Sequence, residues 1–392
     1  MLYYYIITEK EEDRAKYDVW GIFIILKALL NYASINNSKE TYHAIYKALK
    51  SLNEHLDKYP LFEWAKQRWY ECLIPIYVIY DMYKEDWLIS LAYKLHDQGF
   101  DFVSYYKNNF LKVKETVGNW NLITHIVNNV MAVKGYALYS KLTKSKKDIA
   151  NSNFLLKTMN KYHGAVTGAV NGDECFSGKS PIQGSELCSI VELMYSLEYM
   201  INITGDAKYI EQLERLAYNA LPSALTNDMW AHQYDNQVNA PFIKRNDVHP
   251  WTSNGPEANI YGLEPHFGCC TSNFHQGWPK FVNSLIEYDN KGLIINSYAP
   301  TNIKTRKYEI DVNSYYPFDT KNIEINISTT KDIVLRLYKP SWAKEFKINN
   351  ELNLDKPGYI KYKLNKGSHK LVIDIEKELT LENRYKGNVS LI

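Results

Sequence analysis

Residues 185–204 read SELCSIVELMYSLEYMINIT, and apolar side chains recur every three or four positions along this stretch. Such spacing is typical of a helix with one face in a protein core. Gly205 follows directly, as glycine often does at a helix end, and Asp206 opens a second stretch of the same kind over 206–225. The pattern predicts two successive helices joined by a short turn.

The helical spacing extends over most of the first 220 residues, and no strand-like alternation separates the segments. The other segments with this pattern are 17–34, 40–56, 68–83 and 121–142. Helix pairs repeated over this length favour an α/α toroid over a four-helix bundle.

A different pattern begins after about residue 287, where short β-branched runs alternate between apolar and polar residues. These runs are 292–300, 307–316, 321–329, 332–340, 358–365 and 369–377. They predict an antiparallel β-sandwich. We therefore expect a mainly α protein, with an α/α barrel domain over residues 1–289 and a β-sandwich domain over residues 290–392. The last residues, GNVSLI, have the pattern of a further strand, so we expect the sandwich to be truncated.

Composition limits the classes of partner. The 392 residues include 46 Lys and Arg against 44 Asp and Glu, and no stretch concentrates the positive charge. This balance predicts no nucleic-acid partner and no membrane surface, and it favours a small, neutral partner. The apolar segment 21–30 is too short to span a bilayer. The first residues lack the features of a secretory signal, so we expect a cytoplasmic protein if the chain starts at its natural N-terminus. The oligomeric state is left open.

Five cysteines are present, and their arrangement argues against disulfide bonds. Their number is odd, and two are adjacent at Cys269 and Cys270, where a mutual bridge would be strained. No CxxC pair is present, so the spacing leaves two interpretations open, metal ligands or small buried side chains. We expect Cys72 and Cys175 to be buried packing residues. Three short segments hold four of the cysteines together with two glutamates: DECFSG at 173–178, GSELC at 184–188 and GCCTSN at 268–273.

Six ordered motifs carry a resemblance to a known enzyme family. They are DECFSG (173–178), PIQGSELCSIVELMYSLEYM (181–200), LERLAYNALPSAL (213–225), DMWAHQYDNQVN (228–239), NGPEANIYGLEP (254–265) and FGCCTSNFHQGWPKF (267–281). In this order they resemble glycoside hydrolase family 127 and its relatives, the β-L-arabinofuranosidase-like enzymes. The resemblance implies a catalytic (α/α)6 barrel followed by β-sandwich domains. It also implies further barrel helices before the point where this chain begins, so we expect a barrel that is incomplete at its N-terminus.

The resemblance implies a zinc ion held by one glutamate and three cysteines, which match Glu186, Cys188, Cys269 and Cys270. Side chains two residues apart point in nearly opposite directions on a helix. Glu186 and Cys188 can therefore share a metal ion only in the first turn of a helix or just before it. Ser185 directly precedes them and is a suitable N-cap for such a turn.

For catalysis, the resemblance implies that Cys269 is the nucleophile and Glu174 the general acid/base of a retaining double displacement. One sulfur of the adjacent pair would then attack the sugar, while the other would anchor the metal. His125 and Tyr234 match residues that contact the sugar. The implied partner is a carbohydrate, from which terminal β-L-arabinofuranose or a related sugar is released.

The residues leave two other functional classes open. One is a catalytically inactive, zinc-containing carbohydrate-binding relative or fragment. The other is a different glycan-active enzyme on the same toroid, such as an inverting hydrolase or a lyase. Because zinc is expected in the inactive relative as well, a hydrolysis assay and the stereochemistry of its product separate these classes.

Overall fold

The computed structural model describes residues 17–245, 254–263 and 267–392 and divides into two compact units. Unit 1 comprises the described residues up to His163 together with Glu174–Gly178. Unit 2 comprises Gly164–Asp173 and, so far as it is described, Lys179–Ile392. The chain therefore passes from one unit to the other immediately before Glu174.

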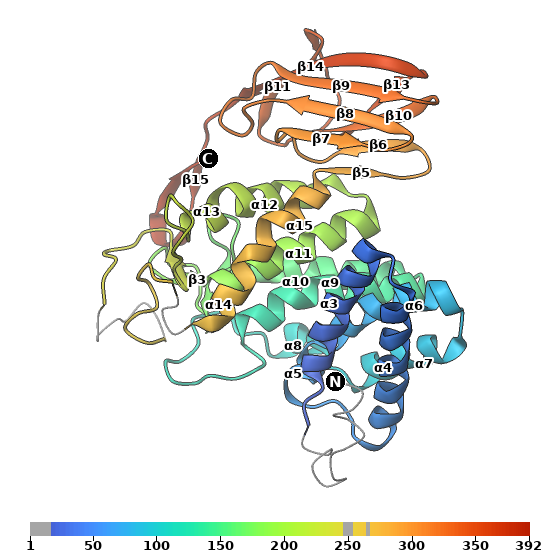
Figure 1. The fold of residues 1–392 in the computed structure, drawn as a ribbon. Helices are drawn as coiled ribbons and strands as arrows, with labels where there is room; N and C mark the ends of the chain where they lie inside the picture. Colours follow the sequence, from blue (N-terminus) through green and yellow to red (C-terminus); the bar gives the residue numbers. More distant parts are fainter. Residues whose placement is uncertain (1–16, 246–253, 264–266) are drawn as a thin grey trace. The chain divides into compact units, whose positions relative to one another are not determined.

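Unit 1 is built from helices, and neighbours in the chain pack as pairs: α3 with α4, α6 with α7, and α9 with α10 (Figure 1). The helices α3, α4, α6 and α9 confirm the four segments predicted from the apolar spacing, whereas α7 and α10 lie outside them. The elements are α3 (Trp20–Asn36), α4 (Lys39–Lys58), α5 (Glu63–Gln67), η1 (Trp69–Cys72), α6 (Leu73–Tyr83), α7 (Asp86–Gln98), α8 (Phe102–Asn108), α9 (Ile126–Thr143) and α10 (Lys146–His163).

Helix α9 lies in the interior of unit 1, because every residue from Ile126 to Ser140 is buried. That stretch includes Lys134, whose ammonium group lies 2.7 Å from Oε1 of the buried Glu71. Lys27 on α3 pairs with the other oxygen of the same carboxylate. Burial alone would raise the pKa of Glu71, but the two ammonium groups outweigh it and lower the pKa to about 2. This buried cluster joins α3, η1 and α9.

Unit 2 contains the helix predicted over 185–204, which the structure places at Leu187–Thr204 as α11. Gly205 ends it with a φ of 62°, a conformation that glycine adopts at low cost. The next predicted helix is interrupted by a π-helical turn at Leu216–Ala220. Pro222 follows this turn and lacks the N–H group that a regular α-helix needs there. The helical elements are η2 (Ala207–Tyr209), α12 (Ile210–Arg215), η3 (Leu216–Ala220), α13 (Leu221–Ser223), α14 (Gly268–Asn273), η4 (Phe274–Gln276) and α15 (Gly277–Ser284).

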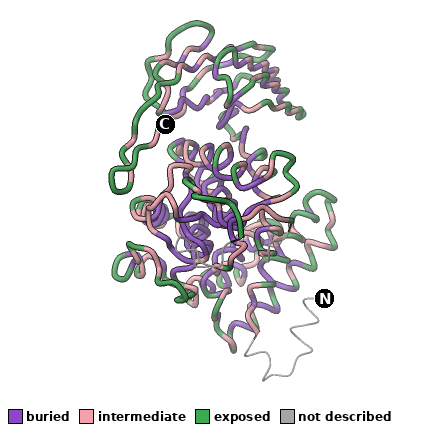
Figure 2. Tube along the Cα trace, turned by 90° about the vertical axis from the view of Figure 1, so that its left-hand side faces the viewer, coloured by how far each residue is buried: buried purple, intermediate pink, exposed green. Residues whose placement is uncertain are grey.

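The C-terminal part of unit 2 is formed by strands in two facing sheets that share one apolar core. Along β9, every second residue is buried and the residues between them are partly accessible. Figure 2 shows buried and more accessible residues interspersed along the strand region. One sheet has the order β13 (Gly358–Leu364), β10 (Ile333–Lys339), β6 (Gly292–Ile295), β5 (Ile286–Tyr288). The other has the order β12 (Glu351–Leu352), β11 (Ala343–Ile348), β14 (Gly367–Lys377), β9 (Ile323–Thr329), β8 (Tyr308–Asn313), β7 (Thr301–Lys304). A hairpin of β15 (Leu381–Asn383) and β16 (Val389–Leu391) follows.

The element order confirms the predicted mainly α fold followed by a β-sandwich, with one correction. Strands β6 and β10 run parallel, with Leu293 opposite Leu335, so the sandwich is not purely antiparallel. Between β6 and β10, the chain forms three strands of the other sheet. After this crossover β10 runs in the same direction as β6. The domain boundary near residue 290 stays a prediction. Among the described residues, no helix has the length and apolar character that crossing a membrane requires.

Within unit 2, the strand region is joined to α12 through a buried carboxylate. Glu214 accepts hydrogen bonds from the hydroxyl groups of Ser297, at 2.5 Å, and Tyr316, at 2.8 Å. Burial raises the pKa of Glu214 to about 7, and the two donors oppose that rise only in part. The contact between α12 and the strand region therefore contains a carboxyl group that titrates near neutral pH.

Candidate active site and metal centre

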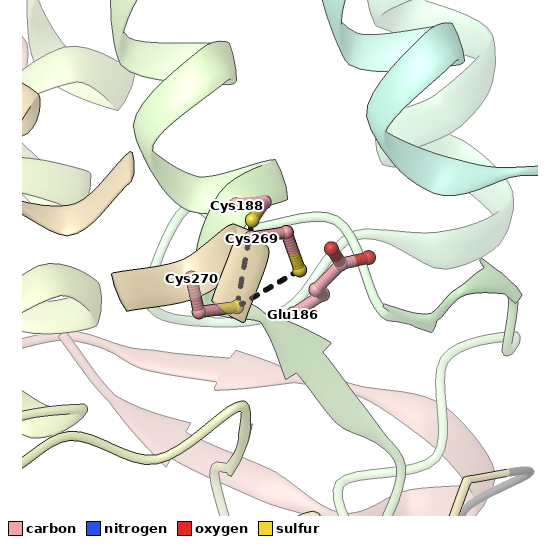
Figure 3. Close-up of side chains that lie close together, drawn as sticks. All are labelled: Glu186, Cys188, Cys269 and Cys270. Atoms are coloured by element: carbon pink, nitrogen blue, oxygen red, sulfur yellow. Dashed lines mark hydrogen bonds between the residues drawn. The ribbon is translucent and has the colours of Figure 1, made fainter. Parts of the chain in front are cut away.

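Four side chains of unit 2 converge on one point (Figure 3). Glu186, Cys188, Cys269 and Cys270 each offer one potential ligand atom, and these atoms all lie within 4.8 Å of one another. The four residues come from two places in the chain that are about 80 residues apart. The structure thus brings together the whole ligand set that the sequence motifs implied.

A strand-to-helix junction positions Glu186 and Cys188. Strand β3 (Gly184–Glu186) pairs antiparallel with β4 (Asp235–Gln237), and α11 starts at the next residue. Glu186 occupies the N-cap position with extended backbone (ψ 133°), and Cys188 lies in the first helical turn. The change from strand to helix turns both side chains toward the same point.

The predicted N-cap at Ser185 is wrong by one residue. Ser185 belongs to β3, and its hydroxyl donates to the side-chain oxygen of Asn171 at 3.1 Å. The ladder between β3 and β4 continues as far as Glu186 opposite Asp235, so the helix cannot begin earlier. The placement of Glu186 and Cys188 at the helix start is nevertheless as expected.

Gly184 is required where β3 passes the buried Asp235. A Cβ atom at Gly184 would lie only 1.6 Å from Oδ1 of Asp235, a distance that no side chain tolerates. The absence of a side chain at this position therefore lets Asp235 pack against β3, two residues before Glu186.

The short helix α14 supplies the other two sulfurs, in different environments. Cys270 is fully buried, and its Sγ lies 3.4 Å from Sγ of Cys188 and 3.9 Å from Sγ of Cys269. Cys269 is exposed. Adjacent residues point about 100° apart on a helix, which is why the Cys270 side chain is buried while Cys269 is exposed.

Contacts on both sides of the cysteine pair hold α14 in place. The ring of Phe267 stacks on Tyr234, with 4.0 Å between the ring centroids. Nε2 of the buried His232 lies 3.0 Å from the hydroxyl oxygen of Thr271. The predicted sugar-contacting residue Tyr234 is itself completely buried, and its hydroxyl accepts a hydrogen bond from Asn254 at 2.8 Å.

The four residues fit a zinc ion in donor type and spacing. Three sulfurs and one carboxylate form a set that zinc prefers, and Zn–S bonds of about 2.3 Å in a tetrahedron place sulfurs about 3.8 Å apart. The separations of 3.4 and 3.9 Å lie close to that value, and both are far too long for a disulfide bond. Hydrogen bonds with the neighbouring thiols, together with burial, raise the pKa of Cys188 well above its usual range, and burial does so for Cys270. Because burial opposes ionisation, a cation is needed to hold these sulfurs as thiolates.

The predicted acid/base residue, Glu174, lies in unit 1 and has a strained backbone. Its φ is 81°, in a region that residues other than glycine rarely adopt. Its Oε2 accepts a hydrogen bond from Nε1 of Trp120 at 3.1 Å and lies 3.3 Å from Nε2 of His125. Strain of this kind persists where surrounding contacts enforce it, and it often occurs at functional sites.

His125, the predicted sugar-contacting histidine, caps helix α9 and faces Glu174. Its Nδ1 accepts a hydrogen bond from the backbone N–H of Asn128 at 3.3 Å. The neutral imidazole therefore carries its proton on Nε2, and donates it toward Glu174. The rings of Trp64 and Trp120 pack against the imidazole with their planes steeply inclined to it, at centroid distances of 5.2 and 6.0 Å.

Sequence reasoning missed several residues around these groups. Trp120 gives no signal in the sequence, because its contact with Glu174 links positions 54 residues apart. Asn273, whose Nδ2 donates to Sγ of Cys188 at 3.1 Å, lies one helical turn after Cys270 in the same motif, and that spacing could have indicated it. Cys72 and Cys175 are buried, as expected.

Comparison with known proteins places this chain among carbohydrate-active proteins. A family model described as the beta-L-arabinofuranosidase, GH127 catalytic domain, matches residues 9–283. No curated protein matches the chain.

Solved structures of similar fold include a GH127 beta-L-arabinofuranosidase from Geobacillus stearothermophilus T6, with 17% identity and a TM-score of 0.72. It is matched over 99% of this chain and 68% of its own length. A protein described as a glycoside hydrolase has 16% identity and a TM-score of 0.71, over 92% of this chain and 64% of its own. A GH127 beta-arabinofuranosidase has 15% identity and a TM-score of 0.61, over 95% of this chain and 63% of its own. The chain thus spans about two thirds of the length of these proteins.

Proposed function

Because this chain belongs to the GH127 family of beta-L-arabinofuranosidase catalytic domains, we propose that it is a retaining glycoside hydrolase with a cysteine nucleophile. The proposed substrate is a glycan with a terminal β-L-arabinofuranose or a related sugar, from which that sugar is released. Its catalytic groups would be Cys269 and Glu174.

The observation that carries the proposal is the unequal exposure within the four-residue cluster. Glu186, Cys188 and Cys270 are buried, whereas Cys269 is exposed. A nucleophile must reach the anomeric carbon of a bound sugar, and metal ligands need no such access. This division supports Cys269 as the attacking group and the other three as its support.

Glu174 is equipped to hold and move a proton. Trp120 and His125 both approach Oε2, so they fix the plane of the carboxyl group and stabilise negative charge on that oxygen. The acidic proton would then sit on Oε1 when the group is protonated. About a quarter of the side chain is exposed, which leaves the carboxyl group accessible to a substrate.

The proposed reaction has two displacements at the anomeric carbon. In the first, Glu174 gives its proton to the glycosidic oxygen while Sγ of Cys269 attacks, so the C–O bond breaks and a C–S bond forms. In the second, Glu174 takes a proton from water, the water oxygen attacks the same carbon, and the C–S bond breaks with its electron pair on sulfur. Two inversions give net retention of configuration. This scheme requires Glu174 about 5 Å from Sγ of Cys269 in the substrate-bound protein.

Glu186, Cys188, Cys269 and Cys270 would hold a zinc ion, whose positive charge favours the thiolate of Cys269 and makes it a better leaving group in the second displacement. His125 and Tyr234 are proposed to contact the sugar.

The test is hydrolysis of 4-nitrophenyl β-L-arabinofuranoside by the purified, zinc-supplemented chain, with the first-formed anomer followed by NMR. We expect the β anomer first, and loss of turnover in Cys269→Ser and Glu174→Gln. Cys175→Ala, next to Glu174, is the matched control and should retain activity. An intact chain that binds the sugar without cleaving it would contradict the proposal and favour a non-catalytic carbohydrate-binding protein. Inverted product would indicate a different mechanism.

A further inference from the structure

Three side chains of unit 2 form a series of hydrogen bonds that ends at the sulfur of Cys188. Nζ of Lys280 donates to Oε1 of Gln276 at 2.7 Å, and Nε2 of Gln276 donates to Oδ1 of Asn273 at 2.8 Å. Nδ2 of Asn273 then donates to Sγ of Cys188 at 3.1 Å. The spacing of positions 273, 276 and 280 places all three on one face of the helical run α14–η4–α15.

The lysine determines the direction of the whole series. An ammonium group has three donors and no acceptor, so Gln276 must present its oxygen to Lys280. Its amide nitrogen therefore faces Asn273, which must accept with its own oxygen. The only group that Asn273 can then turn toward the sulfur is its N–H₂ group. The polarity at Cys188 thus follows from a cation three side chains away.

Both ends of the series also contact helix α11. Cys188 lies in the first turn of α11, and the ammonium group of Lys280 lies 3.7 Å from the ring centroid of Tyr195 on the same helix. Gln276 makes a further, longer contact with the backbone oxygen of Ser272 at 3.5 Å. These contacts limit the freedom of the two amides, so the donor at the sulfur is held in place before any ligand binds.

We propose that Lys280, Gln276 and Asn273 form a polarised relay that directs an N–H donor at the metal-binding sulfur of Cys188 and draws negative charge from it. The inference rests on the metal centre of the proposed function. Hydrogen bonds in series strengthen one another, and the cation at the far end adds to the effect. The three are positioning residues, because none of them would touch the sugar.

The effect on the metal centre can be measured without any substrate. Cobalt(II) replaces zinc in thiolate sites and gives a sulfur-to-metal charge-transfer band whose energy reports the electron density on sulfur. We expect Asn273→Ala to move this band to longer wavelength and to lower zinc affinity, measured by chelator competition, by about 10- to 100-fold. Gln276→Leu and Lys280→Met should act in the same direction with smaller effects, and Lys280→Arg should restore wild-type values. Asn283→Ala, an exposed amide on α15, is the matched control.

The possible results distinguish the relay from a purely structural contact between α15 and α11. If the three side chains only hold α15 against α11, then Asn273→Ala, Gln276→Leu and Lys280→Met should lower the melting temperature and leave the cobalt charge-transfer band unchanged. That result would overturn the relay. A wild-type band in Lys280→Met or in Asn273→Ala would overturn it as well. If Asn273→Ala does not fold, Gln276→Leu carries the same test. Absence of cobalt and zinc binding by the wild-type chain would remove the metal centre and the relay together. Shifted bands in a chain without hydrolase activity would support the relay and contradict only the hydrolase.

Discussion

At the scale of single residues, two neighbours in the chain have different chemical environments. Cys270 is buried against α11, while Cys269 on the same short helix is exposed. A buried sulfur suits a metal ligand, and an exposed one suits a nucleophile. The pair therefore allows a direct test of which sulfur reacts.

A mechanism-based inhibitor, such as a bromoacetamide-bearing or cyclophellitol-type arabinofuranose, should label Cys269 alone, as located by peptide mass spectrometry. Cys270→Ser should mainly weaken zinc affinity, so that added zinc partly restores the rate. Cys269→Ser should stay inactive at every zinc concentration, because no other group forms the covalent intermediate. Label on Cys270, or equal rescue of both variants, would show that the roles are assigned wrongly.

The backbone conformation of Glu174 is unfavourable for any residue that has a Cβ atom. Its φ of 81° suits glycine, so Glu174→Gly should be more stable than Glu174→Ala by about 1 kcal/mol, although both lose the carboxyl group. Urea unfolding of the two variants measures the difference. At the adjacent Cys175, in strand β2 (Cys175–Phe176), the order should reverse, with alanine the more stable. The same order at both positions would mean that the backbone at Glu174 is not strained.

At the scale of secondary structure elements, close approaches decide how the site is assembled. Strand β3 carries Glu186 at its end and passes Asp235 at Gly184, where no room exists for a side chain. The buried helix α9 is likewise joined to η1 and α3 through Lys134 and Glu71. Each of these two contacts can be tested by substituting one residue.

Gly184→Ala should displace β3 and lower stability by about 2 kcal/mol, because the added methyl group would overlap the Asp235 carboxylate. Zinc affinity should fall as well, since Glu186 lies two residues farther along the strand. Gly255→Ala is the matched control, because a Cβ atom there meets nothing within 4 Å. Thermal unfolding and chelator competition give the two readouts, and a Gly184→Ala protein equal to wild type in both would refute the packing argument.

Lys134→Met should destabilise unit 1 by about 3–5 kcal/mol, because it removes the fully buried cation that is paired with a fully buried carboxylate. The double variant Lys134→Met with Glu71→Leu should recover part of that loss, since it leaves no carboxylate in the interior. Lys141→Met, near the exposed end of the same helix, should change stability by no more than about 1 kcal/mol. Equal stability of Lys134→Met and Lys141→Met would contradict the role given to the ion cluster.

At the scale of the whole molecule, a carboxyl group that titrates near neutral pH connects the strand region of unit 2 to its helices. Glu214 on α12 is held by Ser297 and Tyr316 from the strand region, and its pKa is raised to about 7. Between pH 4.5 and 7 the folded chain keeps a proton that the unfolded chain has lost. The stability contributed by this group is therefore fully present below pH 4.5 and is lost as the pH rises through 7.

Glu214→Gln should remove this pH dependence, because the amide does not ionise. Its oxygen accepts from one of the two hydroxyl groups, and its N–H₂ group donates to the other. Relative to the variant, the wild-type free energy of unfolding should fall by about 2.5 kcal/mol between pH 5 and pH 8. Urea unfolding at several pH values gives the difference. Glu211→Gln, on the same helix and partly accessible, should show no such trend. Parallel curves for wild type and Glu214→Gln would exclude this carboxyl group as the cause.

Local pattern in the chain accounts for much of the fold. The apolar spacing over 185–204 and Gly205 together predict α11 and its end to within two residues, because helix period and helix termination depend on neighbours in sequence. The alternation in the C-terminal part likewise predicts β8, β9, β10 and β14. The ordered motifs predict the family and the four residues that converge in Figure 3.

Contacts between distant residues were decided only by the tertiary structure. The start of α11 at Leu187 depends on pairing with β4, and the parallel arrangement of β6 and β10 depends on a crossover through the other sheet. The donors that approach Glu174 and Cys188, Trp120 and Asn273, lie 54 and 85 residues from their acceptors. The physical reason is the range of the interactions: periodicity and capping act within a few residues, whereas burial, strand partners and hydrogen-bond geometry at the site exist only once the chain has folded back on itself.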